Sequence, residues 1–460
     1  MSSYTVSNPS TLESVGEVPA STTKDVASVV EAAARAFPAF SQTPFAERAA
    51  ILKRAARSLR DAADEIAAIL TREQGKPFKE ARIEVERCAD TFDLYGASDV
   101  CAESSSRELP GKTARVVRRP LGVCAAIVPW NFPLTLMANK LVPALATGNT
   151  VVVKPAPTTP LAASRCIELL CAAGLPRGVV GVVIGGVDVG VALIEHPLVR
   201  KVSFTGSTVT GKSIMASASK GLKRLTLELG GNDAMIVCED ADLVGAARAA
   251  AVGRFFNAGQ ACIATKRIYV QRSKYDEFVS RVAERATNLP IGDGFDPKVR
   301  MGPLHSKAQR ESVEDFVRDA LSRGAKVAAG GGRPSQGPGY FFEPTVLVGV
   351  PDDARLIHEE CFGPVLPVIP FDTIEEAFAL ANGTVFGLGS SIWTGDSALQ
   401  ERAVRELDAG YTWINDIATD HDTLPFGGVK ESGFGKERGV EVLNEYTEAK
   451  SVVVGAPAHA

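Results

Sequence analysis

Residues 123–154 read VCAAIVPWNFPLTLMANKLVPALATGNTVVVK, and this stretch decides the fold. The apolar run 123–128 predicts a buried strand, 134–145 a helix and 150–154 a second strand. The alternation continues along the chain, with helices and strands expected at 161–173, 179–184, 187–195 and 201–204. Strands that alternate with helices at this spacing predict a parallel, doubly wound sheet of the Rossmann-like α/β class.

The flanking segments extend this pattern in both directions. Amphipathic helical stretches precede it at 22–40, 45–74 and 77–97, and a polar hairpin is expected over 103–120. Beyond Gly231 the pattern restarts as a second α/β domain, with elements expected at 243–256, 266–271, 274–288, 311–323, 364–371 and 373–382. The apolar tail 450–455 has no later strand to pair with, so we expect it to join a sheet edge in this chain or in another subunit.

Composition bounds the class of protein. A chain of 460 residues exceeds one hydrophobic core, so two or three domains are expected. The net charge of −4, without a basic stripe, argues against nucleic acid as a partner. The eight cysteines form no CxxC pair and the five histidines are dispersed, which predicts a reducing compartment and no metal site. Without a secretory signal or a membrane-length apolar run, a cytoplasmic protein with no membrane partner is expected.

Three residues suggest covalent chemistry. Cys262 lies in NAGQAC, among small and polar residues, and Glu228 lies upstream in the glycine-rich LELGGN. A thiol could attack a substrate while the carboxylate activates water. Asn131 stands between two prolines in PWNFP, where a rigidly held amide could donate to an oxyanion. Each residue also has an ordinary explanation, because a lone cysteine is usually a small buried hydrophobe and an asparagine here a turn residue.

A dinucleotide commonly binds at the carboxyl ends of the strands of a doubly wound sheet. The chain contains no strict GxGxxG to mark such a site. It offers FTGSTVTGK at 204–212, where Gly206 and the Ser207 hydroxyl open a helix N-terminus that suits pyrophosphate but could equally be an ordinary N-cap. Lys154, at the end of a buried strand, is a candidate for ribose hydroxyls or phosphate, or is a solvated strand terminus.

Seven short motifs follow one another between Pro129 and Gly433: PWNFP, VVVKP, FTGSTVTG, LELGGN, NAGQAC, EECFGPV and PFGGVKESG. Each motif alone is weak, whereas seven in this order are specific. The succession resembles the NAD(P)-dependent aldehyde dehydrogenase superfamily, in its hydrolytic type that does not acylate coenzyme A, over nearly the whole chain. The resemblance implies an oxidoreductase of class EC 1.2.1.- that oxidises an aldehyde to the acid with NAD or NADP.

The resemblance assigns catalytic roles to three residues. Cys262 attacks the aldehyde carbonyl, the Asn131 amide and the backbone N–H of Cys262 hold the oxyanion, and hydride transfer leaves a thioester. Glu228 then activates the water that hydrolyses this thioester. Lys140 and Glu437 match a more distal pair thought to relay protons, although two exposed charges are usually just solvated.

The resemblance also implies cofactor contacts and a domain division. Glu360 would bind the nicotinamide ribose and Lys154 the adenosine ribose. The set expected to line the cofactor is Trp130, Lys154, Pro157, Gly186, Gly190, Gly206, Ser207, Glu360 and Phe362. We expect a cofactor domain from 1–100 and 121–230, a catalytic domain from 231–430, and oligomerisation segments at 101–120 and 431–460. A homodimer or homotetramer is expected.

One departure from the family pattern concerns the cofactor. Pro157 stands three residues after Lys154, where NAD-selective members often have an acid that accepts the adenosine ribose hydroxyls. Without that carboxylate a 2′-phosphate is not repelled, so NADP becomes plausible. Glu228 is present, whereas members that transfer the acyl group to coenzyme A usually lack it, so hydrolysis is favoured.

Other departures concern the substrate. Asn139 and Phe256 stand where succinic semialdehyde dehydrogenases carry arginines, which leaves no guanidinium to clamp a carboxylate. Aromatic walls at Phe132, Phe256 and Phe426 would then favour a neutral aromatic or aliphatic aldehyde. Asp420-His421-Asp422 falls in the loop expected to frame the tunnel mouth, where it could select a polar or amine-bearing substrate or be a solvated loop. A semialdehyde dehydrogenase, and a (thio)esterase that uses Cys262 without redox chemistry, remain alternatives.

Overall fold

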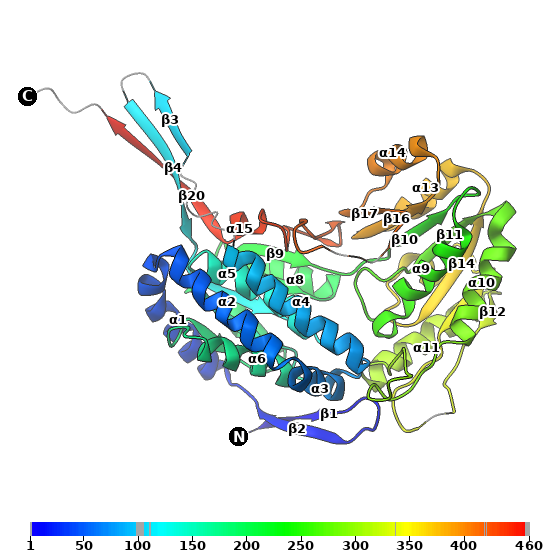
Figure 1. Ribbon diagram of the computed structural model, residues 1–460, viewed down its shortest axis with the longest axis horizontal. Coiled ribbons are helices and arrows are strands. Elements are labelled where there is room, and N and C mark those ends of the chain that lie inside the picture. The colour runs from blue at the N-terminus through cyan, green and yellow to red at the C-terminus, as the bar shows by residue number, and fades with distance from the viewer. Residues whose placement is uncertain are drawn as a thin grey trace, which may run out of the picture.

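The computed structural model describes residues 2–97, 105–109, 112–335, 337–417, 419 and 421–455. Two α/β lobes lie side by side, and a three-stranded sheet projects from one of them (Figure 1). One lobe is built on a six-stranded sheet and the other on a seven-stranded sheet. Part of the expected hairpin, at 103–104 and 110–111, and Asp420 of the expected tunnel loop lie outside the described residues.

The six-stranded sheet has the order β19-β9-β8-β5-β6-β7. Its strands are β5 (Val123–Ile127), β6 (Thr150–Lys154), β7 (Val180–Val182), β8 (Val199–Thr205), β9 (Arg224–Glu228) and β19 (Gly433–Phe434). All pairs are parallel except that of β19 with β9. The helices between these strands are α5 (Pro133–Ala146), α6 (Leu161–Ala172), α7 (Val187–Glu195) and α8 (Thr208–Ser219). The expected doubly wound sheet is confirmed, with β9 and β19 as strands that the sequence pattern did not predict.

Four helices precede this sheet: α1 (Thr23–Gln42), α2 (Phe45–Asp61), α3 (Ala63–Gln74) and α4 (Phe78–Ala97). A capping box starts α1, because the Thr22 hydroxyl accepts the Asp25 N–H and the Asp25 carboxylate accepts the Thr22 N–H. The prediction of one helical stretch over 45–74 is wrong, since the backbone leaves helical geometry at Ala62 (φ −101°, ψ 14°). An N-terminal hairpin of β1 (Ser3–Ser7) and β2 (Ser14–Pro19) was also not expected.

Helices cover both faces of the sheet, which explains why β5 and β6 read as unbroken apolar runs. Cys124, Ala126 and Val151 belong to a core shared with α2 to α6. Ala125 and Val152, their neighbours in sequence, belong to a second core shared with α1, α7 and α8. Successive strand residues point to opposite faces, so each strand must be apolar on both sides. The carboxyl ends of the strands remain as the uncovered edge.

The second lobe has the strand order β12-β13-β14-β11-β10-β16-β17. These strands are β10 (Ala234–Val237), β11 (Arg267–Gln271), β12 (Lys326–Ala329), β13 (Thr345–Val348), β14 (Val365–Phe371), β16 (Gly389–Trp393) and β17 (Tyr411–Ile414). Its helices are α9 (Leu243–Phe255), α10 (Tyr275–Thr287), α11 (Lys307–Ser322), α12 (Arg355–His358), α13 (Ile374–Asn382) and α14 (Ser397–Glu406). A second α/β unit is present as expected, although β10, β12, β13, β16, β17, α12 and α14 were not predicted.

The remaining elements are short. They are the 3-10 turns η1 (Phe256–Gly259) and η2 (Arg272–Lys274), the strand pair β15 (Phe386–Gly387) and β18 (Val429–Lys430), and the helix α15 (Val442–Glu445). No helix within the described ranges is both long and apolar enough to cross a membrane.

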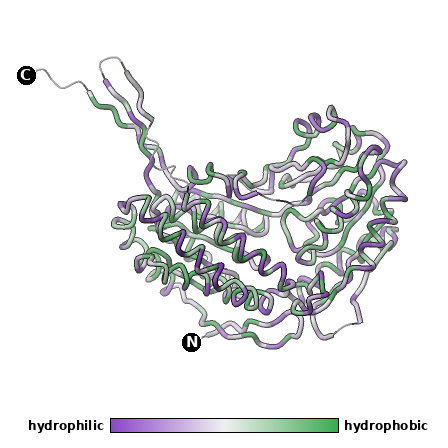
Figure 2. Tube along the Cα trace, in the orientation of Figure 1, coloured by the Kyte–Doolittle hydropathy of each residue, from purple (hydrophilic) through white to green (hydrophobic). Residues whose placement is uncertain are grey.

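The projecting sheet consists of β3 (Ser105–Leu109), β4 (Lys112–Pro120) and β20 (Thr447–Gly455), in the order β20-β4-β3. The C-terminal tail therefore pairs with β4 of its own chain, from Thr447 opposite Pro120 to Gly455 opposite Lys112. Hydrophobic residues gather near the outer end of β20 (Figure 2), where more than half of the surface of Val453 and of Val454 is exposed. A three-stranded arm with exposed valines is a surface that another protein chain could cover.

Gly433 provides a test of how the C-terminal segment is held over β9. Its φ is +115°, and a Cβ there would lie 1.9 Å from the Leu227 carbonyl oxygen. Gly349 is a matched control, because its φ is +60° but a Cβ would meet nothing within 4 Å. Both substitutions to alanine carry a left-handed penalty of about 1–2 kcal/mol, and only Gly433→Ala adds a backbone clash. We expect calorimetry to give a lower unfolding midpoint for Gly433→Ala; equal midpoints would show that β19 moves without cost.

Candidate active site

The carboxyl ends of β5, β8 and β9 meet the loop that follows α9 in a pocket of about 240 Å³. Eight of the residues expected from the sequence line it: Trp130, Asn131, Gly206, Ser207, Glu228, Cys262, Glu360 and Phe362. Ligands of doubly wound sheets bind at this edge. The fold thus brings all three candidate catalytic residues together with five candidate cofactor residues.

The other four candidate cofactor residues form a second group at the neighbouring strand end. Lys154 ends β6, and Pro157 is half-buried in the turn that follows. Gly186 caps α7, and a Cβ on Gly190 of that helix would lie 3.7 Å from Lys154 Cε. Burial lowers the pKa of Lys154, with Asp188 acting in the opposite direction, and its ammonium has no hydrogen-bond partner among the described residues. A buried cation without a partner fits the hydroxyls or phosphate of a dinucleotide.

Gly206 and Ser207 open α8 at the pocket wall. The Ser207 hydroxyl accepts the Thr210 N–H (3.3 Å), so this side chain is an ordinary N-cap. A Cβ on Gly206 would lie 2.3 Å from the Phe204 ring, which requires glycine next to the pocket. The first N–H groups of a helix lack intrahelical partners, so the turn can still bind pyrophosphate through its backbone.

A sharp reversal after α9 places Cys262. Asn257, Ala258 and Gly259 all have positive φ, at 48°, 54° and 73°. This conformation costs a non-glycine residue about 1–2 kcal/mol. A Cβ on Gly259 would lie 2.3 Å from the Gly363 carbonyl oxygen, so the tightest point of the reversal accepts only glycine. Backbone strain of this kind persists where the surroundings hold the chain firmly, which is common at functional sites.

Asn257 ties this reversal to the other lobe. Its N–H donates to Glu80 Oε2 (3.0 Å), and its side-chain amide donates to the Asn131 carbonyl (3.1 Å). Its Oδ1 accepts a hydrogen bond from Gln74 Nε2 (3.1 Å), while its own carbonyl accepts one from Gln260 Nε2 (2.9 Å). Gln74 and Glu80 lie in or near long helices and carry no motif, so sequence reasoning missed them. Asn257 and Gln260 lie inside NAGQAC, which could have signalled them.

Asn131 is fixed through both its side chain and its backbone. Its Nδ2 donates to the Gln260 carbonyl (3.0 Å), which leaves the second amide N–H for a substrate oxygen. Its own carbonyl accepts a hydrogen bond from Lys76 Nζ (2.8 Å). Lys76 forms a buried ion pair with Glu84 (2.5 Å), and Glu84 Oε1 accepts the Leu134 N–H (2.8 Å) at the start of α5. This ion pair holds the backbone that carries the amide, and no sequence signal pointed to it.

Glu228 ends β9 as a buried carboxyl group without a hydrogen-bonding nitrogen or oxygen donor among the described residues. Burial raises the pKa of Glu228 to about 8, and repulsion from Glu437 adds to the shift. Lys140 and the Cys262 thiol act in the opposite direction. A carboxyl group with a pKa near the working pH can accept a proton and later release it, as a general base must.

The Cys262 thiol is half-buried at the pocket wall. Burial raises its pKa well above the ordinary value, and the acids Glu228, Asp233 and Glu360 raise it further. Lys266 is the group that lowers it. In this arrangement the thiol is protonated at neutral pH, so attack on a substrate requires a base to remove the proton.

Lys140 and Glu437 are buried, so the interpretation of two exposed, solvated charges is wrong. Their side chains are 0% and 2% exposed, and Lys140 Nζ lies 2.6 Å from Glu437 Oε1. The same ammonium donates to Thr205 Oγ1 (2.6 Å), and Thr205 lines the catalytic pocket. The pair therefore acts on Glu228 through its charges, in line with a proton path, which stays a prediction.

Aromatic rings frame the cofactor side of the pocket. Trp130 stacks on His305, with centroids 4.6 Å apart, and meets Phe362 edge-on at 5.7 Å. Gln309 also lines the pocket and donates to the Phe362 carbonyl (2.6 Å). Sequence reasoning missed Gln309 because one glutamine on a helix has no motif. Within the described ranges, no group of three or more His, Cys, Asp or Glu side chains is arranged to hold a metal ion.

A guanidinium group that the sequence did not reveal lies beside Asn139, and whether it can bind a substrate carboxylate stays a prediction. With its Oδ1 facing Arg438, Asn139 accepts a hydrogen bond from Arg438 Nε (3.2 Å) and donates to the Thr135 carbonyl (3.2 Å). Arg438 is buried and forms an ion pair with Asp422, at 2.6 Å, in the expected tunnel loop. The sequence did not reveal this contact because Arg438 sits in a left-handed turn (φ 58°) after β19.

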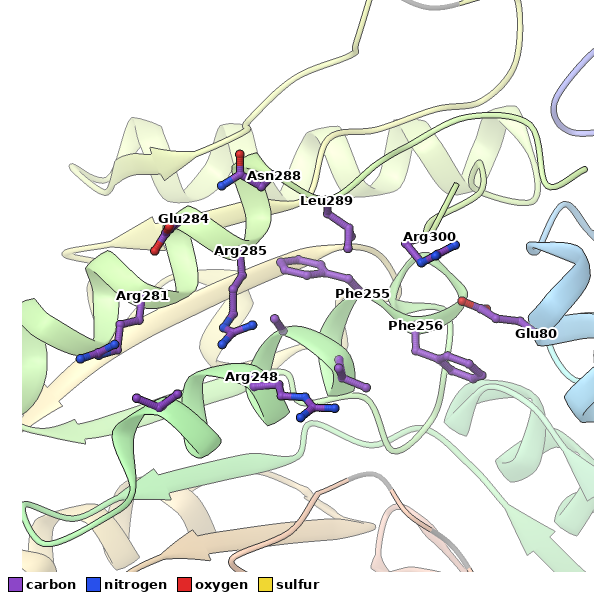
Figure 3. A pocket seen from close by; sticks show the side chains of 13 residues that line it. Glu80, Arg248, Phe255, Phe256, Arg281, Glu284, Arg285, Asn288, Leu289 and Arg300 are labelled. Atoms are coloured by element: carbon purple, nitrogen blue, oxygen red, sulfur yellow. The ribbon is translucent and has the colours of Figure 1, made fainter. Parts of the chain in front are cut away.

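The three phenylalanines expected to wall the tunnel do not form one cluster. Phe132 stacks on Phe256, with centroids 6.0 Å apart, whereas Phe426 lies 6.0 Å from Tyr411. Phe256 also lines a larger pocket of about 610 Å³ between α9 and α10, with Glu80 of α4 beside it (Figure 3). That pocket shares no lining residue with the pocket of Cys262.

Comparison with known proteins agrees with this site. Residues 1–452 match the model of the aldehyde dehydrogenase family. The chain is 39% identical to the NADP-dependent succinate-semialdehyde dehydrogenase GabD of Escherichia coli, over 98% of this chain and 94% of that protein. It is 41% identical to the betaine aldehyde dehydrogenase of Sinorhizobium fredii, over 94% and 89% of the two chains.

A solved structure gives the same result. The crystal structure of PnpE in complex with nicotinamide adenine dinucleotide superposes with a TM-score of 0.97 and 40% identity, over 100% of this chain and 95% of that chain. The resemblance inferred from the seven motifs is therefore confirmed over the whole length of the fold. This chain belongs to the aldehyde dehydrogenase family.

Proposed function

We propose that this NAD(P)-dependent aldehyde dehydrogenase, of class EC 1.2.1.-, oxidises a neutral aldehyde through a thioester on Cys262 that Glu228 helps to hydrolyse. The main observation in support of this proposal is that Cys262, Glu228 and Asn131 line the same pocket. A (thio)esterase would need no cofactor cleft, whereas Glu360 and Phe362 share this pocket with the nucleophile.

The first step is addition of Cys262 Sγ to the aldehyde carbon. The thiol first gives its proton to a water molecule, and the carbonyl oxygen becomes negative as the carbonyl π bond opens and the C–S bond forms. The free N–H of the Asn131 amide and the backbone N–H of Cys262 would donate to this oxygen. One such donor typically stabilises the transition state by about 2.7–4 kcal/mol. When bound, NAD(P) accepts a hydride from the carbon, which is chemistry that no side chain here supplies.

The second step is hydrolysis of the resulting thioester. Glu228 takes a proton from a water molecule, and the hydroxide adds to the acyl carbon and expels the Cys262 thiolate. Because its pKa is about 8, Glu228 is partly ionised near neutral pH and becomes fully ionised above it. The buried Lys140–Glu437 pair stands next to it as the route by which the proton could leave.

We propose that both NAD and NADP are accepted. Pro157 offers no carboxylate that would repel a 2′-phosphate, and Lys154 is a buried cation without a hydrogen-bond partner among the described residues. The relatives point to both cofactors, since the GabD relative is named for NADP and PnpE was crystallised with nicotinamide adenine dinucleotide.

The proposed substrate class is a neutral aromatic or aliphatic aldehyde. Asp422 neutralises the Arg438 guanidinium, so this site offers no unpaired positive charge to a carboxylate. A semialdehyde is the second candidate, favoured by the 40% identity to the glutarate-semialdehyde dehydrogenase of Pseudomonas aeruginosa. A semialdehyde would need the Arg438 guanidinium to exchange Asp422 for the substrate carboxylate, whereas a neutral aldehyde would leave this ion pair in place.

We further propose a homodimer or homotetramer held through the projecting arm, in a reducing compartment such as the cytoplasm. The exposed Val453 and Val454 on β20 support the first point. The seven cysteines in the described part of the chain are all unpaired, which supports the second. The domain division at 230 and 430 also stays a proposal, with β19 contributing Gly433 to the sheet of the first lobe.

Glu228→Gln keeps the shape of the side chain and removes the base. We expect a single-turnover burst of reduced cofactor to survive in stopped-flow absorbance, while steady-state turnover falls by about 100-fold or more. In the parent enzyme, turnover should rise with pH through about 8 as Glu228 ionises, and this rise should vanish in the variant. Cys262→Ala is the control, with folding and cofactor binding kept and both phases lost. Equal loss of burst and steady state in Glu228→Gln would place Glu228 in the activation of Cys262.

Pro157→Glu adds the carboxylate that NAD-selective members carry. We expect the ratio of kcat/KM for NAD over NADP to rise about tenfold or more, equivalent to about 1.4 kcal/mol of selective repulsion of the 2′-phosphate. Ala156→Glu, which adds the same charge one residue earlier, is the control and should change the ratio less. A parent enzyme that ignores NADP completely would show that another residue enforces the choice.

Asp422→Asn removes the carboxylate charge that pairs with the Arg438 guanidinium, without changing the size of the side chain. We expect the ratio of kcat/KM for succinic semialdehyde over hexanal to rise about tenfold, because the guanidinium can then bind a carboxylate. The gain should disappear in the double variant with Arg438→Met. A tenfold preference for the semialdehyde in the parent enzyme would contradict the neutral-aldehyde assignment and leave the catalytic residues unaffected.

A further inference from the structure

Lys266, four residues after Cys262, places a buried ammonium group behind the nucleophile. Its side chain is 1% exposed. Nζ donates to the carbonyl oxygen of Ala261 (3.1 Å) and to that of Cys262. The backbone N–H of Lys266 donates to the Asp233 carbonyl (3.0 Å), which ties the end of the loop to the start of β10. A buried ammonium is costly unless hydrogen bonds and an opposite charge compensate it, so this placement needs a reason.

The opposite charge is Glu360. Lys266 Nζ lies 3.1 Å from Glu360 Oε1, and the same oxygen accepts the Gly231 N–H (3.1 Å). The other oxygen, Oε2, packs over Gly230, where a Cβ would lie only 2.4 Å away. Gly230 lines the catalytic pocket and Glu360 is 19% exposed, so one carboxylate oxygen is held by the protein while the other lies at the pocket.

We propose that Lys266 is a positioning residue, whose ammonium group fixes both the carbonyl groups of the Cys262 loop and one carboxylate oxygen of Glu360. The inference rests on the proposed function, in which Cys262 is the nucleophile and Glu360 binds the nicotinamide ribose. One buried cation then sets where the thiol points and which oxygen of Glu360 is offered to the cofactor. Attack and cofactor binding depend on the same group.

The charges around Cys262 determine in which direction the pH of thiol ionisation should change when Lys266 is replaced. Glu228, Asp233 and Glu360 face the thiol and disfavour the thiolate, while Lys266 favours it. Asp233 and Glu360 also face Lys266 and are partly neutralised by it. Removal of the ammonium leaves the thiol beside these acids without the cation that favours the thiolate, which must raise the pH at which the thiol ionises. Removal of the Glu360 charge alone must lower that pH.

The test uses Lys266→Met in the full-length protein. Two readouts are followed: the pH midpoint for iodoacetamide alkylation of the Cys262 peptide by mass spectrometry, and the Kd for NADP from quenching of tryptophan fluorescence. Following the Cys262 peptide is necessary because Cys171 is also exposed. We expect the midpoint to rise by about one pH unit and the Kd to increase about tenfold.

Lys201→Met is the matched control for loss of any buried ammonium. The Lys201 side chain is likewise buried, at 0% exposed. It donates to Thr226 Oγ1 (2.6 Å) and lies over the Tyr446 ring, with no part in the pocket of Cys262. It should leave both the alkylation midpoint and the Kd unchanged. If Lys266→Met leaves both quantities unchanged, or if Lys201→Met shifts them equally, the proposal is wrong.

Two further variants decide the matter if Lys266→Met does not fold. Lys266→Arg keeps the charge and should hold the alkylation midpoint close to that of the parent. Glu360→Gln should lower the midpoint while it weakens NADP binding, which is opposite in sign to Lys266→Met for the thiol. A midpoint that rises or stays constant in Glu360→Gln overturns the proposal. Neither readout requires turnover, so absence of aldehyde oxidation in the parent would refute the proposed function and leave the test of Lys266 intact.

Discussion

The left-handed reversal at Asn257, Ala258 and Gly259 is the constraint on which the rest of the site depends. It turns the chain from α9 toward β11 and brings Cys262 to the end of β9, where Glu228 stands. Three positive φ angles in succession would not persist in an isolated loop. They persist because Asn257 makes hydrogen bonds to Gln74, Glu80 and Asn131 of the other lobe. Cys262 and Asn131, the proposed nucleophile and oxyanion donor, are therefore held by one set of contacts.

Three ion pairs with a buried lysine lie close to the residues of the candidate site. Lys76 pairs with Glu84, Lys140 with Glu437 and Lys266 with Glu360, at 2.5, 2.6 and 3.1 Å. Buried pairs recover little or none of their desolvation cost, so their value lies in orientation more than in stability. Each one holds something that the chemistry needs: the Asn131 carbonyl, the surroundings of Glu228, or the Cys262 loop.

Glu228 is the exception among these acids, since it has no hydrogen-bonding nitrogen or oxygen donor in the described part of the chain. A buried carboxyl group without such a donor lowers the stability of the folded protein, because its desolvation is not offset by a hydrogen bond. Its pKa near 8 follows from that isolation. The protein thus places fixed charges around one buried group that is able to change its charge, and this contrast is what a general base requires.

Specificity is where sequence reasoning and structure differ most. The residues at positions 139 and 256 predict a tunnel without a cation. In the folded protein, however, Arg438 contacts Asn139, and Asp422 pairs with the Arg438 guanidinium. The related enzymes are named for different aldehydes, a succinate semialdehyde and betaine aldehyde among them. Under the proposed function, selectivity would depend on whether Asp422 pairs with Arg438, as well as on Asn139 and Phe256.

Local pattern was enough for the sequence to determine the strand–helix alternation from 123 to 205, because apolar periodicity and glycine turns act over a few residues. It also singled out Asn131, Glu228 and Cys262 as candidates, because seven motifs that are weak alone become specific in their order along the chain; the catalytic roles of these residues stay a proposal. Short strands such as β10 and β17, with four residues each, were missed because so few residues set no clear period.

Only the tertiary structure decided which charges are buried and what they hold. Lys140 and Glu437 are separated by 297 positions, and Lys76 and Asn131 by 55. No local pattern distinguishes such a lysine from one on the surface, since its burial depends on which distant elements pack over it. The identity of the reacting groups is a property of short motifs; their orientation, their pKa values and the available charge at the substrate are properties of the packed chain.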